Sequence, residues 1–169
     1  FNDFSMALEL KPEDRTVYYS FGELFYFEEE YDKSIYYFSK AIEIDPLYID
    51  PYLMRSEVYM IKKEYNKSLN DLSNAFEIDS TNTWIYINRA DIYDKMKEYS
   101  KVIEEYDKAI RINPNDKWLY FYKGHFFRRS LRKYDKALNE FNKALSIDSK
   151  WPKIYNALAI IFESQKEYD

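Results

Sequence analysis

The sequence has a single histidine, His125, and histidine is the residue type best suited to proton transfer because imidazole titrates near neutral pH. General acid–base catalysis also needs a matched partner and a substrate pocket, and no Ser/His/Asp arrangement can be argued here. The adjacent carboxylates Glu104 and Glu105 would point to different sides of a helix. One histidine and no cysteine exclude multi-histidine and cysteine-ligated metal centres, and two glycines exclude glycine-rich phosphate loops. We therefore expect no enzyme activity, no metal and no cofactor.

Acidic side chains recur at a fixed interval: Glu23, Glu57 and Asp91 are each 34 residues apart. If one surface carries all three, its carboxylates would favour a ligand with lysine or arginine side chains. The alternative is that the acids are solvated charges that only keep the surface soluble. The choice between the two depends on the elements that hold these acids, and therefore on the repeat to which they belong.

The acids are part of an internal repeat that runs through the whole chain. A tyrosine recurs with spacings of 34, 34, 35 and 34 residues at Tyr31, Tyr65, Tyr99, Tyr134 and Tyr168. Two further columns, by which we mean equivalent positions in successive repeats, keep the same register: Ala7, Ala41, Ala75, Ala109 and Ala144, and Tyr18, Tyr52, Tyr86, Tyr120 and Tyr155. A fixed period of this length predicts a solenoid of stacked units. The one extra residue lies between Phe127 and Tyr134, where a turn can accommodate it.

The apolar residues within one unit follow the period of an α-helix, in two stripes: Tyr18, Phe21, Gly22 and Phe25, and Ser34, Phe38, Ala41 and Ile42. Prolines recur where one pair of helices would give way to the next, since proline cannot continue a helix. One column of the first stripe holds only small residues: Gly22, Ser56, Ala90, Gly124 and Ala159. Glycine inside a helix costs about 1 kcal/mol relative to alanine, so we predict that a neighbouring helix comes close at this column.

The sequence Tyr18…Gly22…Phe25…Ser34…Phe38…Ala41…Pro46 resembles the tetratricopeptide repeat (TPR), which has this period and this order of residues. The resemblance implies an all-α fold, a right-handed superhelical array of antiparallel helix pairs, or TPR-like α-solenoid. It covers four full repeats, which we number 1 to 4: 15–48, 49–82, 83–116 and 117–151. The flanking segments match a second helix (1–14) and a first helix (152–169), so we expect one continuous solenoid that is a fragment of a longer chain.

Proteins of this family line a concave groove with the first helix of each repeat and hold an extended or helical peptide there. Carried onto this sequence, the resemblance implies a groove lined by Tyr19, Glu23, Tyr26, Phe27, Leu53, Glu57, Trp84, Ile87, Asn88, Asp91, Trp118, Phe121, Tyr122 and His125. Its acids and aromatic side chains predict a partner peptide with basic and apolar residues. Co-chaperone members hold the acidic tail of Hsp70 or Hsp90, but only Asn88 of the five matching residues fits that clamp. We therefore expect no Hsp70 or Hsp90 tail binding.

Positive charge gathers in repeat 4, which has nine basic and three acidic residues although the chain's net charge is −5. Four of the cations form what we call the basic turn: Arg128, Arg129, Arg132 and Lys133. This turn could contact an acid, a phosphate or an anionic lipid. The alternative is an exposed charge run with no ligand. The acidic total makes a general nucleic-acid binder an unfavourable interpretation, so we expect no nucleic-acid partner.

We predict a non-catalytic protein–protein interaction scaffold that binds a partner peptide or helix in its groove. The alternative is a substrate-recognition or regulatory arm of a larger enzyme. The longest apolar run, 157–162, is too short to span a membrane, and we expect a cytoplasmic location. Phe1, Phe4 and Phe162 would leave apolar surface at the two ends, so we also expect the chain to continue or to self-associate there.

Overall fold

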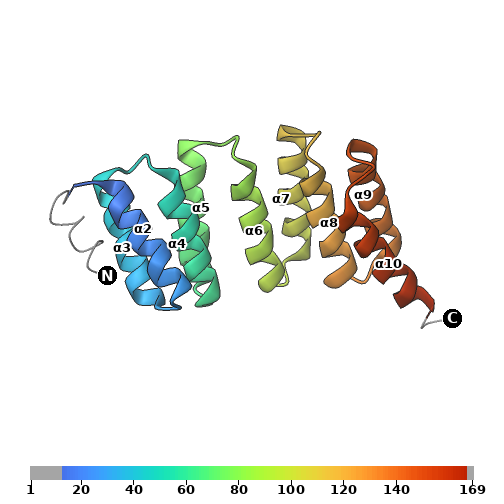
Figure 1. Cartoon of the computed structure of the whole chain (residues 1–169), viewed down its shortest axis with the longest axis horizontal. Helices are drawn as coiled ribbons and strands as arrows, with labels where there is room; N and C mark the ends of the chain where they lie inside the picture. Colours follow the sequence, from blue (N-terminus) through green and yellow to red (C-terminus); the bar gives the residue numbers. More distant parts are fainter. Residues whose placement is uncertain (1–12, 167–169) are drawn as a thin grey trace. The chain divides into compact units, whose positions relative to one another are not determined.

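A computed structural model describes residues 13–166, with side chains as far as Glu163, and within that range every regular element is an α-helix (Figure 1). The first helices of the repeats are α2 (Arg15–Phe27), α4 (Ile49–Ile61), α6 (Thr83–Lys95), α8 (Lys117–Arg129) and α10 (Pro152–Lys166). The second helices are α3 (Tyr31–Ile44), α5 (Tyr65–Ile78), α7 (Tyr99–Ile112) and α9 (Tyr134–Ile147). The predicted all-α arrangement of helix pairs is confirmed. The second helix expected over residues 1–10 lies outside the described residues.

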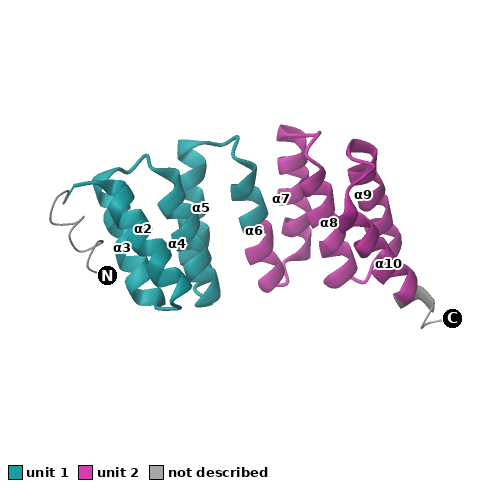
Figure 2. Cartoon of the chain, viewed as in Figure 1, with its two compact units in different colours: residues 1–88 teal, residues 89–169 magenta. Residues whose placement is uncertain are grey.

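The chain divides into two compact units, residues 1–88 (unit 1) and residues 89–169 (unit 2), as Figure 2 shows. The boundary falls within α6, at Asn88 and Arg89, and therefore inside repeat 3. Unit 1 holds α2 to α5 and the first half of α6, and unit 2 holds the rest of α6 and α7 to α10. The repeat boundaries and the single continuous solenoid remain predictions.

Each first helix is joined to its second helix by a tight turn that contains one residue with positive φ. These residues are Glu29, Lys63, Lys97 and Arg132, with φ of 59°, 61°, 62° and 52°. In repeat 1, Glu29 N–H donates to Tyr26 (3.1 Å) and Glu30 N–H donates to Phe25 (2.9 Å), the paired bonds of a Schellman motif. In repeat 4, Lys133 N–H reaches back to Phe127 (2.9 Å) instead. The extra residue of this repeat is therefore accommodated in the turn, where the sequence placed it.

The two helices of a repeat pack closely at the column of small residues. Ser34 Oγ donates to the Gly22 carbonyl (2.8 Å), and Ser68 Oγ donates to the Ser56 carbonyl (2.6 Å), so the same bond joins the helices of repeats 1 and 2. The four described alanines of the repeated column are fully buried: Ala41, Ala75, Ala109 and Ala144. The predicted close approach of a neighbouring helix is confirmed.

Charged side chains join helices inside each unit. In unit 1, Arg55 donates to both oxygens of Asp71 (2.8 and 2.7 Å) and to Ser39 Oγ (2.7 Å), which connects α4 to α5 and to α3. In unit 2, Lys123 pairs with Asp107 (2.6 Å) on α7 and lies 3.8 Å from Glu140 on α9. A first helix is thus held both by its own second helix and by that of the preceding repeat.

Candidate functional site

Helix α2 of unit 1 carries two half-buried tyrosines, Tyr19 and Tyr26, that lie next to acidic side chains. Tyr26 of α2 donates its hydroxyl to Glu57 Oε1 of α4 (2.7 Å), a bond that links repeats 1 and 2. Burial and this hydrogen bond raise the pKa of Tyr26 to about 12. Burial and the neighbouring Glu23 carboxylate likewise raise the pKa of Tyr19. Both tyrosines therefore stay protonated at neutral pH, and Tyr26 donates its hydroxyl to the carboxylate of Glu57.

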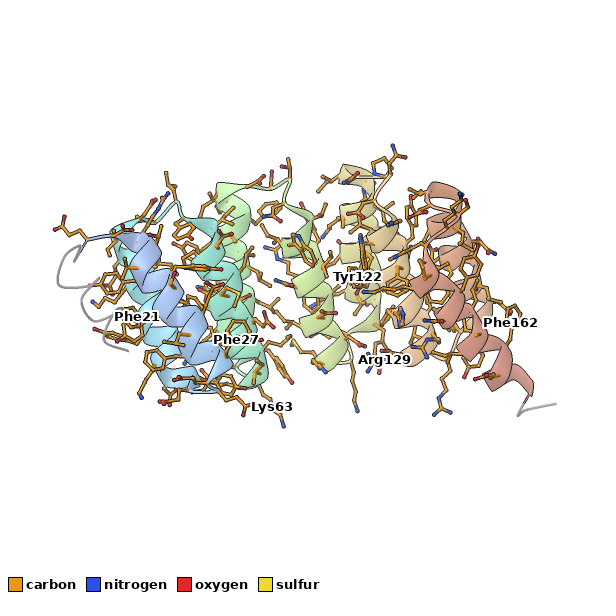
Figure 3. The ribbon with its side chains drawn as sticks, in the orientation of Figure 1. Phe21, Phe27, Lys63, Tyr122, Arg129 and Phe162 are labelled. Carbon is orange, nitrogen blue, oxygen red and sulfur yellow. The ribbon has the colours of Figure 1, made fainter. Side chains whose placement is uncertain are left out.

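The remaining predicted groove residues of unit 1 differ widely in exposure. Phe27, at the end of α2, is 77% exposed, and Trp84, in the first turn of α6, is 54% exposed. Leu53 and Asn88 are half-buried. Ile87 is only 6% exposed, so its side chain belongs to the interior and offers almost no surface to a ligand. Figure 3 labels Phe27 together with the core residue Phe21 of the same helix.

An aromatic cluster surrounds Tyr19. Its ring centroid lies 5.5 Å from that of Tyr48 and 5.7 Å from that of Phe38. The guanidinium of Arg15 lies 4.7 Å above the Tyr48 ring and pairs with Asp45. Tyr48 immediately precedes α4, a position where α2 and α8 have the capping residues Asp14 and Asp116. A ring has therefore replaced a helix cap at this site.

Unit 2 contains a similar cluster on α8. Trp118 stacks on Tyr122 with centroids 5.9 Å apart, and Phe121 lies between them on the helix. Trp151 is buried against both Trp118 (4.6 Å) and Phe121 (4.9 Å). The ammonium of Lys117 lies 4.8 Å from the Trp151 ring and also pairs with Asp148. Trp151 immediately precedes α10, so a ring again stands where a cap is expected.

The two clusters use the same columns of repeats 1 and 4. The equivalent pairs are Arg15 and Lys117, Tyr19 and Phe121, Phe38 and Phe141, Asp45 and Asp148, and Tyr48 and Trp151. Tyr48 and Trp151 were not among the site residues predicted from the sequence. A signal was present, since the column that precedes each first helix holds Asp14, Tyr48, Asn82, Asp116 and Trp151, in which two rings stand among capping residues.

His125 lies on α8 next to this second cluster. Its ring is 4.4 Å from Phe121 and 5.6 Å from Phe141, and Arg128 Nη2 lies 3.1 Å from its Nδ1. A guanidinium can only donate, so Nδ1 accepts and the proton of the neutral ring is on Nε2. Burial, and then the charges of Arg128 and Arg129, lower the pKa of His125 to about 4. At neutral pH the imidazole is therefore uncharged.

Asp91, the third acid of the predicted row, lies on the part of α6 that belongs to unit 2, and its side chain is exposed. Glu23 and Glu57 belong to unit 1. The structure therefore brings Glu23 and Glu57 into one unit, and a single surface that carries all three acids remains a prediction.

The basic turn begins inside α8. Arg128 and Arg129 are in the last turn of that helix, and Arg132 and Lys133 are in the connection to α9. Arg129, Arg132 and Lys133 are exposed, and Arg128 is half-buried with a buried Nε that has no hydrogen-bond partner. Burial, followed by the like charge of Arg129, lowers the pKa of Arg128. Within residues 13–166 none of the four cations forms an ion pair.

Two further features of the described part of the chain concern ligands and membranes. No group of three or more His, Cys, Asp or Glu side chains in it is arranged to hold a metal ion. None of its helices combines the length and the apolar character that crossing a bilayer requires.

Comparison with known structures identifies the same architecture. A thermophilic TPR protein from Thermus thermophilus, TTC0263, superposes with a TM-score of 0.78 at 18% identity, covering 94% of this chain and 87% of that chain. A crystal structure of MamA gives 0.71 at 22% identity, covering 87% and 85%. The APC/C hetero-tetramer Cut9–Hcn1 gives 0.72 at 18% identity, covering 96% of this chain but 32% of that one. Similarity at these identities shows the fold.

Sequence comparison agrees with the structural one. No curated protein sequence gives a significant match. Three models of the family described as tetratricopeptide repeat match residues 16–46, 83–116 and 105–139, and together cover slightly more than half of the chain. The chain therefore belongs to the tetratricopeptide repeat family.

Proposed function

We propose that this chain is a non-catalytic scaffold that holds a peptide or helix of a partner protein against the faces of its first helices. Membership of the tetratricopeptide repeat family supports a protein–protein interaction role. One of the similar structures was solved as a hetero-tetramer, Cut9–Hcn1, so this fold occurs in an assembly with another protein. A role of that general kind is what we infer for this chain.

The observation that carries the proposal is the exposure of aromatic side chains on the first helices. Phe27 is 77% exposed and Trp84 is 54% exposed in unit 1, and aromatic residues are the common anchors of binding surfaces. In unit 2 the stacked Trp118 and Tyr122 present further half-buried rings. Glu57 adds negative charge among the first helices of unit 1. A peptide that carries lysine or arginine next to an apolar residue would satisfy both features.

His125 contributes packing to this scaffold and no proton transfer. Its contacts are aromatic rings and a guanidinium, and its low pKa leaves the ring uncharged at neutral pH. A general base works best when its pKa lies near the working pH and when a partner group orients it. The pKa of His125 is about 4, well below neutral pH, and the group that orients its ring is a guanidinium, which cannot accept a proton.

The experiment that tests the proposal is a selection of binding peptides from a random displayed library, followed by titration of the selected peptides against two variants. The double variant Phe27→Ala/Trp84→Ala removes the exposed rings of the first helices. The matched control Tyr36→Ala/Leu47→Ala removes side chains of the same unit that are 54% and 73% exposed but lie on α3 and the α3–α4 turn. We expect at least about tenfold weaker binding for the first variant only. Equal affinity losses in the two variants would show that the exposed rings of the first helices have no special role in binding.

A further inference from the structure

The connection between the first and second helices carries different charges in repeat 4 than in the other full repeats. In repeats 1 to 3 the residue before the second helix is a glutamate, and it pairs with the lysine three residues later: Glu30 with Lys33, Glu64 with Lys67, and Glu98 with Lys101. In repeat 4 the same two positions hold Lys133 and Lys136. One ion pair has thus been replaced by two like charges.

This replacement is unfavourable for the fold. A cation at the N-terminus of a helix opposes the helix dipole, whereas a glutamate there is stabilising by roughly 0.3–1 kcal/mol. The two lysines also repel one another at a spacing that places them on the same side of the helix. Arg128 and Arg129, at the C-terminal end of α8, add two more cations to the same turn (Figure 3 labels Arg129). The protein therefore keeps a local arrangement that its other repeats avoid.

The cations of this turn also lack the ion-pair partners that several other cations of unit 2 have. Lys123, Lys108 and Lys143 are each paired with an acid of their own or a neighbouring helix. No ion pair to the basic turn or to Lys136 occurs in the described residues, and Lys136 instead lies 5.7 Å from the Phe127 ring. The buried Nε of Arg128 remains without an acceptor. Because the adjacent His125 is uncharged at neutral pH, it neither adds to nor neutralises this positive charge.

We propose that the basic turn, together with Lys136, is a docking site for a carboxylate-rich segment of a partner protein. Unpaired guanidinium and ammonium groups concentrated on one connection are complementary to side chains of Asp and Glu, and Arg forms two-point hydrogen bonds with a carboxylate. This site belongs to unit 2 and is basic, whereas the acids Glu23 and Glu57, which favour basic peptides, belong to unit 1. A partner could use both sites through segments of opposite charge, but each site stands without the other.

The deciding variant is Arg132→Glu/Lys133→Glu. Repeat 1 already has glutamate at both equivalent positions: Glu29, which has positive φ, and Glu30, which precedes α3. The new residue at 133 can pair with Lys136 as in repeats 1 to 3, so we expect no loss of thermal stability. The matched control is Lys63→Glu/Lys97→Glu, which changes the net charge equally and alters the positive-φ residues in the turns of repeats 2 and 3.

Binding is measured by fluorescence anisotropy with a labelled oligoglutamate peptide at about 50 mM salt, where exposed charges are weakly screened. We expect the wild-type chain, the control variant and Phe27→Ala/Trp84→Ala to bind this peptide alike. We expect Arg132→Glu/Lys133→Glu to lose at least about tenfold in affinity. Survival of binding in that variant, an equal loss in the control, or no preference of the wild type for oligoglutamate over oligoserine would each overturn the proposal. Stronger binding of a single-stranded RNA at the same turn would overturn it in favour of a polyphosphate ligand.

Discussion

The ring of Phe38 occupies the space that a side chain at position 22 would need. A Cβ built on Gly22 would lie 2.9 Å from Cγ of Phe38 and closer still to two other ring carbons. Repeat 4 has the same relationship, with a Cβ on Gly124 only 2.5 Å from Cε1 of Phe141. The corresponding pairs in repeats 2 and 3 are Ser56 with Leu72 and Ala90 with Tyr106. Glycine therefore occurs only in the two full repeats where phenylalanine stands opposite.

The variant Gly22→Ala should unfold more easily than the wild-type chain, by about 1–3 kcal/mol, although alanine is the better helix former. The physical reason is that Phe38 is fully buried and cannot swing away without displacing other core residues. Urea unfolding followed by circular dichroism measures the change. A variant as stable as the wild type, or more stable, would show that the ring moves aside at no cost.

A double-mutant cycle with Phe38→Leu isolates this contact. Leu72 stands opposite Ser56 in repeat 2, so the combination Gly22→Ala/Phe38→Leu closely resembles a pairing that the protein already uses. We expect the alanine to be tolerated or stabilising in the Phe38→Leu background, and hence a coupling of about 1 kcal/mol or more between the two sites. Simple additivity of the two single changes would contradict the steric explanation.

The buried ion pair of repeat 2 has an apolar counterpart in repeat 1. Asp71 is 2% exposed and receives two of the three hydrogen bonds of Arg55. The equivalent residues of repeat 1, Phe21 and Tyr37, stack with centroids 4.9 Å apart. Removing one partner, as in Asp71→Leu, should destabilise the chain by about 3–5 kcal/mol, because it leaves a guanidinium unpaired. Thermal unfolding of purified variants reports this loss.

The double replacement Arg55→Phe/Asp71→Tyr serves as the control, since it installs the repeat 1 pair in repeat 2. Apolar replacement of a buried ion pair is often neutral or stabilising, so we expect most of the stability lost in Asp71→Leu to be regained. If the double variant is as unstable as Asp71→Leu, the stability of repeat 2 depends on the hydrogen bond from Arg55 to Ser39, which an apolar pair cannot replace.

The repeat made most of the fold predictable, because one period fixes many residues at once. The column of small residues predicted a close helix contact, and Gly22 against Phe38 shows that contact. The position of the extra residue in repeat 4 was also predictable, since turns accommodate insertions and helices do not. Salt bridges such as Arg55–Asp71 could also have been predicted from the sequence. Their two columns hold Phe and Tyr in repeat 1 but a cation and an acid in repeats 2 to 4.

The candidate site was less predictable, because a column defines a position but not how far a side chain is buried there. Ile87 shares its column with Tyr19 and Phe121 yet is buried, so equivalence in sequence did not give equal exposure. Trp151 was missed for the opposite reason. It stands at a capping position, where rings are unusual, and only the packing against Trp118 shows its role.

The turns of repeats 2 and 3 should become more stable when their positive-φ residue is glycine. Lys63 and Lys97 adopt φ near 60°, a conformation that costs a residue with a side chain roughly 1–2 kcal/mol. Glycine removes this cost, but its greater freedom in the unfolded chain offsets part of the gain. We expect Lys63→Gly to raise the free energy of unfolding by about 0.5–1 kcal/mol and Lys97→Gly to do so independently. Lys62→Gly is the control, because Lys62 has φ of −72° and gains nothing; a stability increase there would contradict the backbone explanation.

His125 should make the stability of the chain depend on pH below neutrality. Its pKa is about 4 in the folded state and near 6.5 when unfolded, so the unfolded chain binds the proton more tightly. Stability is therefore fully present above about pH 6.5 and falls as the pH drops towards 4, by about 2 kcal/mol after allowance for partial solvent screening.

As His125 is the only histidine of the sequence, one imidazole NMR titration gives the folded-state pKa without assignment of other histidines. His125→Gln should flatten the pH profile of the melting temperature between pH 6.5 and 4. A measured pKa near 6.5, or an unchanged profile in His125→Gln, would mean that Arg128, Arg129 and the surrounding rings do not suppress protonation.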